Sequence, residues 1–381
     1  MTLVDLTDEQ LRSRGSIKWT FGPPDVLPAW VAEMDFALAE PVSHALHDAV
    51  DRGDVGYPAL DRHTGVPDAL AGFALERWGW SVGPESVVLT GDVMAGVHLA
   101  LTALCDDAPV VVPTPAYPPF LDVVPLSGRR MQAVPLAPEA DSATLDLDAV
   151  DGAFRAGART ILLCNPHNPW GRAFTREELE GLRDVVLRHG ARVVSDEIHA
   201  PLVLPGSTHV PYASLEGTAA HTTTLLSASK AWNVPGLKSA QLVAGSEADL
   251  KVLRSLPPVA NHGASPLGHV AARAAYSSGG PWLDGLVERL GSNNALFDEL
   301  VATRLPRARR RPLEATYLAW LDARAYGHDN PSAVALERGR VLVNDGRTFG
   351  PGGAGHVRVN LATSPDRVRE TVRRLARAWE R

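Results

Sequence analysis

Cysteine is scarce in this chain of 381 residues, which contains only Cys105 and Cys164. Two cysteines in apolar stretches cannot build a disulfide framework or a cysteine-rich zinc site, so both are expected in the core. The chain also lacks a long uninterrupted apolar run, and no segment is predicted to span a membrane. No positively charged segment followed by an apolar one opens the sequence, so no secretory signal is expected and the predicted location is the cytoplasm.

Positive charge is also in deficit. Lys and Arg number 37 against 44 Asp and Glu, which gives a formal net charge of −7. Without a surplus basic field to attract phosphate groups, neither a nucleic acid nor an anionic membrane is expected as a partner. Hydrophobic residues make up 45% of the chain and charged residues 21%, the balance of an ordinary globular protein that is long enough for more than one domain.

Short apolar strands alternate with helices through the middle of the chain. The predicted strands cover residues 87–90, 109–112, 160–164, 192–195, 223–226 and 241–244. One predicted helix covers residues 92–104, and another begins with a capping box, Thr175 with Glu178, and stops near Gly190. This alternation predicts an α/β fold with a mostly parallel central sheet that helices cover on both faces.

The C-terminal part has a different pattern, with predicted strands over residues 313–322 and 357–361 and helices before and after them. We therefore expect a large domain over residues 41–275. A smaller α+β domain is expected from residues 276–381, joined by an N-terminal arm of residues 1–40.

Polar residues follow directly after four of the predicted strands, at residues 91–92, 165–168, 196–199 and 227–230. In an open parallel sheet, ligands bind outside the carboxyl ends of the strands. Four polar loops at one edge of one sheet can therefore converge on a single ligand, although they lie far apart in the sequence.

Lys230 is the candidate nucleophile, because a desolvated lysine has a lowered pKa and can attack an aldehyde. Asp196 is a candidate buried carboxylate facing a protonated ring nitrogen, and His199 can bond to an oxygen of the same ligand. The ordinary alternatives are an exposed lysine in a polar turn and an aspartate that caps a helix. No metal is expected, because the companion ligands that a metal site needs are missing.

Further residues extend the candidate site. A helix that opens after Gly91 offers free N–H groups and its dipole to a phosphate. An arginine inside an alternating strand can clamp a carboxylate through two hydrogen bonds. Each residue can equally be a turn, a helix cap, an aromatic core residue or a surface arginine. The candidates are Asp92, Val93 and Met94 with Ser227, Ser229, Lys238 and Tyr57 for a phosphate, Asn168 and Tyr117 for a ring, and Arg358 for a carboxylate.

Taken together and in this order along the chain, these segments resemble the fold-type I enzymes of the class I/II aminotransferase superfamily, which depend on pyridoxal 5′-phosphate (PLP). Within it the chain is similar to the cystathionine β-lyase-like C–S lyases of the MalY/PatB type. His199 stands where typical aminotransferases of the superfamily have Tyr. The segments that carry the second resemblance are residues 27–36 (LPAWVAEMDF), 195–199 (SDEIH), 209–214 (HVPYAS) and 229–237 (SKAWNVPGL).

The resemblance implies a PLP-dependent transferase-like fold and a homodimer in which Tyr57 reaches the cofactor phosphate of the partner. It implies that Lys230 binds the cofactor covalently and that Asp196 and Lys230 are catalytic. Arg358, Trp30 and Glu33 are expected at the amino-acid substrate. Glu33 departs from the usual Asp of the branch, which places the substrate preference in doubt more than the cofactor chemistry.

The predicted function is α,β-elimination of L-cystathionine or a related cysteine S-conjugate to a thiol, pyruvate and ammonia. An aminotransferase acting on an L-amino acid and a 2-oxo acid is the alternative, because it shares the steps up to proton removal from Cα. A third reading, a PLP-binding regulator with a protein partner, stays open. Cleavage products would support the first reading and amine transfer without thiol release the second.

Overall fold

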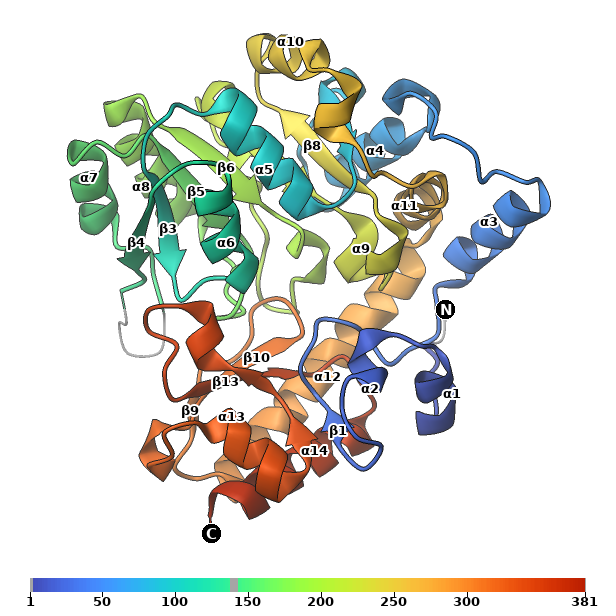
Figure 1. Ribbon diagram of the computed structural model, residues 1–381, viewed down its shortest axis with the longest axis vertical. Coiled ribbons are helices and arrows are strands. Elements are labelled where there is room, and N and C mark those ends of the chain that lie inside the picture. Colours follow the sequence, from blue (N-terminus) through green and yellow to red (C-terminus); the bar gives the residue numbers. More distant parts are fainter. Residues whose placement is uncertain (1–2, 138–142, 381) are drawn as a thin grey trace.

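The computed structural model describes residues 3–137 and 143–380. A seven-stranded sheet flanked by helices fills the upper part of the view in Figure 1, and a four-stranded sheet with the C-terminal helices fills the lower part. Among the described residues, no helix is long and apolar enough to cross a membrane.

The seven-stranded sheet has the strand order β2-β8-β7-β6-β5-β3-β4. Every neighbouring pair is parallel except the two pairs that β8 makes, so the predicted mostly parallel sheet is confirmed with one antiparallel strand. β8 runs antiparallel to both of its neighbours, and the segment that connects it to β7 holds the short helix over Ala228–Ala231 and a 3₁₀ turn over Pro235–Leu237. The strands are β2 (Val87–Thr90), β3 (Val110–Thr114), β4 (Met131–Pro135), β5 (Thr160–Cys164), β6 (Arg192–Asp196), β7 (Thr222–Leu226) and β8 (Ala240–Ala244).

Helices cover both faces of this sheet, as the continuous apolar strands predicted. Along β5 the side chains alternate: Leu162 packs into one apolar cluster, while Ile161 and Leu163 pack into another. The first cluster includes residues of α5, α6 and α10, and the second includes residues of α7 and α8. The bounds of these helices are α5 (Val93–Leu104), α6 (Pro118–Leu126), α7 (Leu147–Arg155), α8 (Arg176–His189) and α10 (Glu247–Ser255).

Local capping signals set the ends of two helices that border the polar loops. Asp92 caps α5 and accepts a hydrogen bond from the backbone of Ala95 at 2.8 Å. Thr175 and Glu178 form the predicted capping box of α8, and Gly190 ends this helix with a φ of 57°. Both ends agree with the sequence prediction, because side chain and backbone groups only a few residues apart decide them.

The four-stranded sheet is antiparallel, with the order β12-β13-β10-β9. The N-terminal arm joins this part, because β1 (Leu27–Pro28) pairs with β11 (Val341–Leu342). The domain boundaries near residues 40 and 275 stay a prediction. The remaining strands are β9 (Arg309–Arg310), β10 (Leu318–Asp322), β12 (Asn344–Asp345) and β13 (His356–Asn360).

The remaining helices join the two sheets and complete the chain. α12 runs between the upper and lower parts of Figure 1, and α11 packs against α3 and α4. They are α1 (Asp8–Ser13), α2 (Ile17–Thr20), α3 (Glu40–Asp51), α4 (Val66–Trp78), α9 (Ala228–Ala231), α11 (Pro266–Ser278), α12 (Gly280–Arg304), α13 (Pro331–Val334) and α14 (Pro365–Trp379).

One predicted strand was too long, and one strand of the seven-stranded sheet was not predicted. The predicted strand over residues 313–322 is a strand only over Leu318–Asp322, because Thr316 has a φ of 68° and Ala315 bridges to Val203 instead. β4 was not predicted, since it lies at the edge of the sheet and only part of it is buried. An edge strand needs fewer apolar residues and so leaves a weaker signal.

Candidate active site

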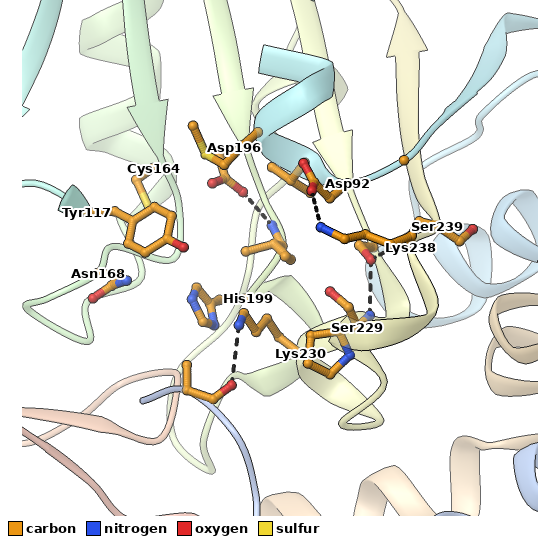
Figure 2. Close-up of a pocket in the computed structure, with 17 residues that line it drawn as sticks. Asp92, Tyr117, Cys164, Asn168, Asp196, His199, Ser229, Lys230, Lys238 and Ser239 are labelled. Carbon is orange, nitrogen blue, oxygen red and sulfur yellow. Dashed lines mark hydrogen bonds and ion pairs between the residues drawn. The ribbon is translucent and has the colours of Figure 1, made fainter. Parts of the chain in front are cut away.

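A cavity opens at the edge of the seven-stranded sheet where the parallel strands end, as the polar loops predicted. Figure 2 shows Tyr117 and Asn168 on one side and Asp92 with Lys238 on the other, with Lys230 between them. The cavity is lined by Ala32, Gly91, Asp92, Val93, Met94, Tyr117, Cys164, Asn168, Asp196, Ile198, His199, Ser227, Ser229, Lys230, Pro235, Lys238 and Ser239.

Lys230 lies in α9, directly after β7, and Ser227 caps this helix by accepting a hydrogen bond from the backbone of Ser229 at 3.0 Å. The Nζ of Lys230 donates one hydrogen bond, to the carbonyl oxygen of Ala32 at 3.3 Å (Figure 2). Burial and, to a smaller extent, the positive charge of Arg358 lower the pKa of Lys230 to about 8, while Glu33 and Asp196 act in the opposite direction. Part of the population therefore carries a neutral amine near pH 7, which can attack a carbonyl or remove a proton.

Asp196 ends β6 and is buried. Its Oδ1 accepts a hydrogen bond from the backbone of Ile198 at 3.0 Å. Burial raises the pKa of Asp196 to about 7; the bond from Ile198 and the charge of Lys230 oppose this, and the charge of Glu197 adds to it. A buried carboxylate that is this costly to ionise favours a cationic partner, such as a protonated ring nitrogen.

A buried network lies directly behind Asp196. Glu197, which is fully buried, accepts hydrogen bonds from the hydroxyl of Ser195 at 2.8 Å and the backbone of Tyr212 at 3.1 Å. Its other carboxylate oxygen lies 2.9 Å from the Nε2 of His209. These contacts tie the end of β6 to the segment over residues 209–214, so they explain why two of the motifs behind the resemblance occur together.

His199 and Asn168 both line the cavity. Burial, together with the positive charges of Lys230 and Arg358, lowers the pKa of His199 to about 3, so its ring is neutral at pH 7. Its buried Nδ1 has no hydrogen-bond partner among the described residues. Asn168 accepts a hydrogen bond from Arg358 at its Oδ1, which leaves its amide nitrogen as a donor on the side of Tyr117 in Figure 2. Both side chains can donate to an oxygen of a bound ring.

The opposite end of the cavity is formed by the first turn of α5 and by Lys238. The Nζ of Lys238 lies 2.7 Å from the Oδ2 of Asp92. The hydroxyl of Ser227 donates to the carbonyl oxygen of Ser239 at 2.7 Å, so its hydrogen is occupied within the chain. Backbone N–H groups at the start of a helix together with a lysine form an anion site, which suits a phosphate.

Arg358 lies in β13 and connects the small sheet with the candidate site. It is buried, and it donates to the Oδ1 of Asn168 at 3.0 Å, the Oδ1 of Asn344 at 2.7 Å and the carbonyl oxygen of Trp30 at 3.3 Å. All three acceptors are neutral. Burial lowers the pKa of Arg358 to about 10, so it stays a cation at pH 7. A buried guanidinium without a carboxylate among these partners fits the expected clamp on the carboxylate of a substrate.

Four expected site residues lie outside the lining of the cavity: Arg358, Trp30, Glu33 and Tyr57. The carbonyl oxygen of Trp30 accepts a hydrogen bond from Arg358, and Glu33 lines a neighbouring cavity. Tyr57 is 97% exposed and does not line the cavity of its own chain. Its expected contact with a partner subunit stays a prediction.

Six residues that line the cavity were not among the predicted site residues: Ala32, Gly91, Cys164, Ile198, Pro235 and Ser239. Gly91 and Ile198 lie in the polar loops that follow two of the predicted strands. Ala32 and Pro235 lie inside motifs already noted, and Ser239 follows Lys238, so position in a motif was an available signal. Cys164 was expected in the core; it is buried, but it also borders the cavity beside Asp196.

The residues fit PLP, the cofactor that the resemblance implies. The amine of Lys230, whose pKa is lowered, can react with the aldehyde of PLP. The buried carboxylate of Asp196 can pair with the protonated ring nitrogen. The unpartnered Nδ1 of His199 and the amide of Asn168 can bond to the hydroxyl oxygen of the ring. The start of α5 with Lys238 suits its phosphate. The buried, unpartnered His199 atom is the observation that favours a bound ligand over a self-sufficient polar core.

Comparison with curated proteins gives relatives over nearly the whole chain. A cystathionine beta-lyase from Corynebacterium glutamicum is 40% identical over 373 residues, which cover 97% of this chain and 98% of the relative. The cystathionine beta-lyase PatB from Bacillus subtilis is 35% identical over 385 residues, 98% of this chain and 99% of PatB. The predicted similarity to the MalY/PatB type is therefore confirmed.

Solved structures give the same fold. A crystal structure from Corynebacterium diphtheriae has a TM-score of 0.94 and 38% identity, and the match covers 100% of this chain and 99% of that one. The PLP-bound C–S lyase from Staphylococcus hominis has a TM-score of 0.91 and 26% identity, with coverage of 97% and 96%. The family model for aminotransferases of class I and II matches residues 31–375, and the chain therefore belongs to this family.

Proposed function

We propose that this protein is a PLP-dependent C–S lyase that cleaves L-cystathionine or a related cysteine S-conjugate. The observation that carries the proposal is that Lys230 and Asp196 are both desolvated and line the same cavity, with pKa values of about 8 and 7. Full-length similarity to the C. glutamicum cystathionine beta-lyase and the fold shared with the PLP-bound C–S lyase of S. hominis support the cofactor and the reaction.

Each residue has a role in the proposed elimination. Arg358 binds the α-carboxylate of the substrate and orients its Cα–H bond. The neutral Nζ of Lys230 removes the proton from Cα. When bound, the cofactor ring supplies a sink for the electron pair left on Cα. Asp196 keeps the ring nitrogen protonated through its negative charge, and His199 and Asn168 donate to the ring oxygen.

The products follow from the bond that breaks. The electron pair from Cα forms a Cα–Cβ double bond, and the Cβ–S bond breaks with the sulfur leaving as a thiolate. The aminoacrylate that is released takes up water and yields pyruvate and ammonia. Lys230 carries the proton from Cα and can return it to the leaving sulfur.

We also propose that the protein is a cytoplasmic homodimer in which Tyr57 serves the site of the partner. Tyr57 is 97% exposed, and Val55 and Leu60 beside it are 67% and 65% exposed. Three large exposed apolar side chains in one short segment are typical of an interface rather than of a free surface. Light scattering of the purified protein measures the mass, and a monomer would contradict this proposal.

An aminotransferase is the second candidate, because the matching family model is that of the class I and II aminotransferases. Both reactions begin with removal of the Cα proton by Lys230. They differ afterwards, because an aminotransferase passes the amino group to a 2-oxo acid and keeps the side chain of its substrate intact, so no Cβ–S bond breaks.

The two candidates can be separated with one incubation. The purified, PLP-loaded protein is mixed with L-cystathionine, and free thiol and pyruvate are measured together. We expect both products to rise in equal amounts. Transfer of the amino group to an added 2-oxo acid without thiol release would overturn the lyase proposal and establish the aminotransferase.

A further inference from the structure

A second cavity lies beside the candidate active site, under the N-terminal arm. We call it the arm pocket; Arg14, Lys18, Glu33, Met34, Asn233 and Pro235 are among its lining residues. Pro235 lines both cavities. Ala32, whose carbonyl oxygen accepts the hydrogen bond of Lys230, lines the first cavity, and the next residue, Glu33, lines the arm pocket. The two cavities are therefore neighbours.

Most of the charges in the arm pocket already have partners. The Nζ of Lys18 lies 2.9 Å from the Oδ1 of Asp35, and both side chains are buried. Lys18 also donates to the carbonyl oxygen of Glu33 at 3.1 Å. Arg14 donates through its Nη2 to the carbonyl oxygen of Phe36 at 3.0 Å. A guanidinium has five N–H donors, so Arg14 keeps capacity for a further acceptor.

The carboxylate of Glu33 differs from these groups. It is half-buried, and among the described residues its carboxylate oxygens have no hydrogen-bond or ion-pair partner. Its charge acts to raise the pKa of Lys230, so it lies within electrostatic range of the reactive amine. It acts in the same direction on Arg14 and Lys18, although neither cation forms a hydrogen bond or an ion pair with its carboxylate oxygens among the described residues. A half-buried carboxylate gains most from a cation that supplies hydrogen bonds.

We propose that the arm pocket receives the far end of the substrate and that Glu33 binds an ammonium group there. The inference rests on the proposed lyase function and names its substrate class: thioethers of cysteine that carry a second amino-acid group, as L-cystathionine does. Glu33 takes the distal ammonium, and Arg14 faces the carboxylate that accompanies it. Cysteine thioethers that end in a plain alkyl group leave Glu33 without a partner, so they are poorer substrates.

The first test compares two substrates, L-cystathionine and S-propyl-L-cysteine, with the PLP-loaded protein. The measured quantity is the ratio of their kcat/KM values, taken from pyruvate release. We expect Glu33→Gln to lower this ratio about tenfold, the effect of one charge-assisted hydrogen bond. Glu33→Asp keeps the charge and should fall between. Glu9→Gln removes an exposed charge from α1 and is the matched control, with an expected change of less than about twofold.

The second test measures binding without cleavage. L,L-2,7-diaminosuberate replaces the sulfur of cystathionine with a methylene group, and L-2-aminosuberate lacks the distal amine as well. As competitive inhibitors of S-propyl-L-cysteine cleavage, they should differ about tenfold in Ki with the unmodified protein and less than about threefold with Glu33→Gln.

The outcomes separate this inference from the proposed function. An unchanged substrate ratio in Glu33→Gln, together with an unchanged gap between the two inhibitors, would overturn the role of Glu33 and leave the lyase intact. If the unmodified protein releases no pyruvate from either thioether, the proposed function itself fails, and the inference fails with it.

Discussion

The two ends of the candidate active site use the same residue types in opposite ways. At the inner end, Lys230 and Asp196 are desolvated, form no ion pair with each other, and have pKa values near 8 and 7. At the outer end, Lys238 and Asp92 are 54% and 43% exposed and lie 2.7 Å apart. Desolvation alone would raise the pKa of Asp92, but the hydrogen bond and charge of Lys238, together with hydrogen bonds from the backbone of α5, outweigh it and lower the pKa. A buried group without an ion-pair partner has a pKa near neutral pH and can therefore give or take a proton. An exposed ion pair keeps both groups charged and can contribute to binding a ligand.

The largest effect is expected from breaking the inner end. Lys230→Ala removes the general base, and we expect pyruvate formation from L-cystathionine to fall about 10³-fold. The measurement is kcat under saturating PLP and substrate. Circular dichroism should show an unchanged fold, since the side chain of Lys230 makes a single hydrogen bond within the described part of the chain. A variant that keeps more than a tenth of the activity would contradict the role of Lys230.

The pH dependence of the inner end gives a smaller and sharper test. Because the pKa of Lys230 lies near 8 rather than at its ordinary 10.5, the neutral amine disappears only below pH 8. The rate at which the PLP-free protein attaches added PLP should rise about tenfold per pH unit up to pH 8 and then level off. Stopped-flow absorbance between pH 6 and 10 measures it. A rate that still rises tenfold per unit at pH 10 would show an ordinary lysine.

The smallest effect is expected at the outer end. Lys238→Ala removes one phosphate contact from a partly exposed position, and we expect the Kd for PLP to rise about tenfold. Lys251→Ala, which removes an exposed lysine from α10, is the matched control and should leave the Kd within about twofold. Equilibrium titration of the PLP-free protein measures both. A rise in Kd of about 10³-fold in Lys238→Ala, as large as the fall in kcat expected for Lys230→Ala, would contradict the contrast between the two ends.

Local signals account for much of the fold and for the lining of the site. Strand β5 and the capping box of α8 were predicted with their observed limits, because apolar runs and side chain–backbone contacts act over a few residues. The antiparallel direction of β8 was not predicted. Strand direction depends on which neighbours a strand meets in the sheet, and the apolar pattern of a buried strand is the same in either direction.

The sequence by itself determined which side chains follow the strand ends, and hence that Lys230, Asp196 and His199 share one cavity. It also determined the family, because the ordered motifs run over the whole chain. Only the tertiary structure decided how these groups behave. Arg358 meets Asn168 across 190 positions of the chain. Glu33, in the N-terminal arm, lines the arm pocket, and its carboxylate has no hydrogen-bond or ion-pair partner among the described residues. Burial and contacts between distant segments set these charges, and neither is encoded in a local pattern.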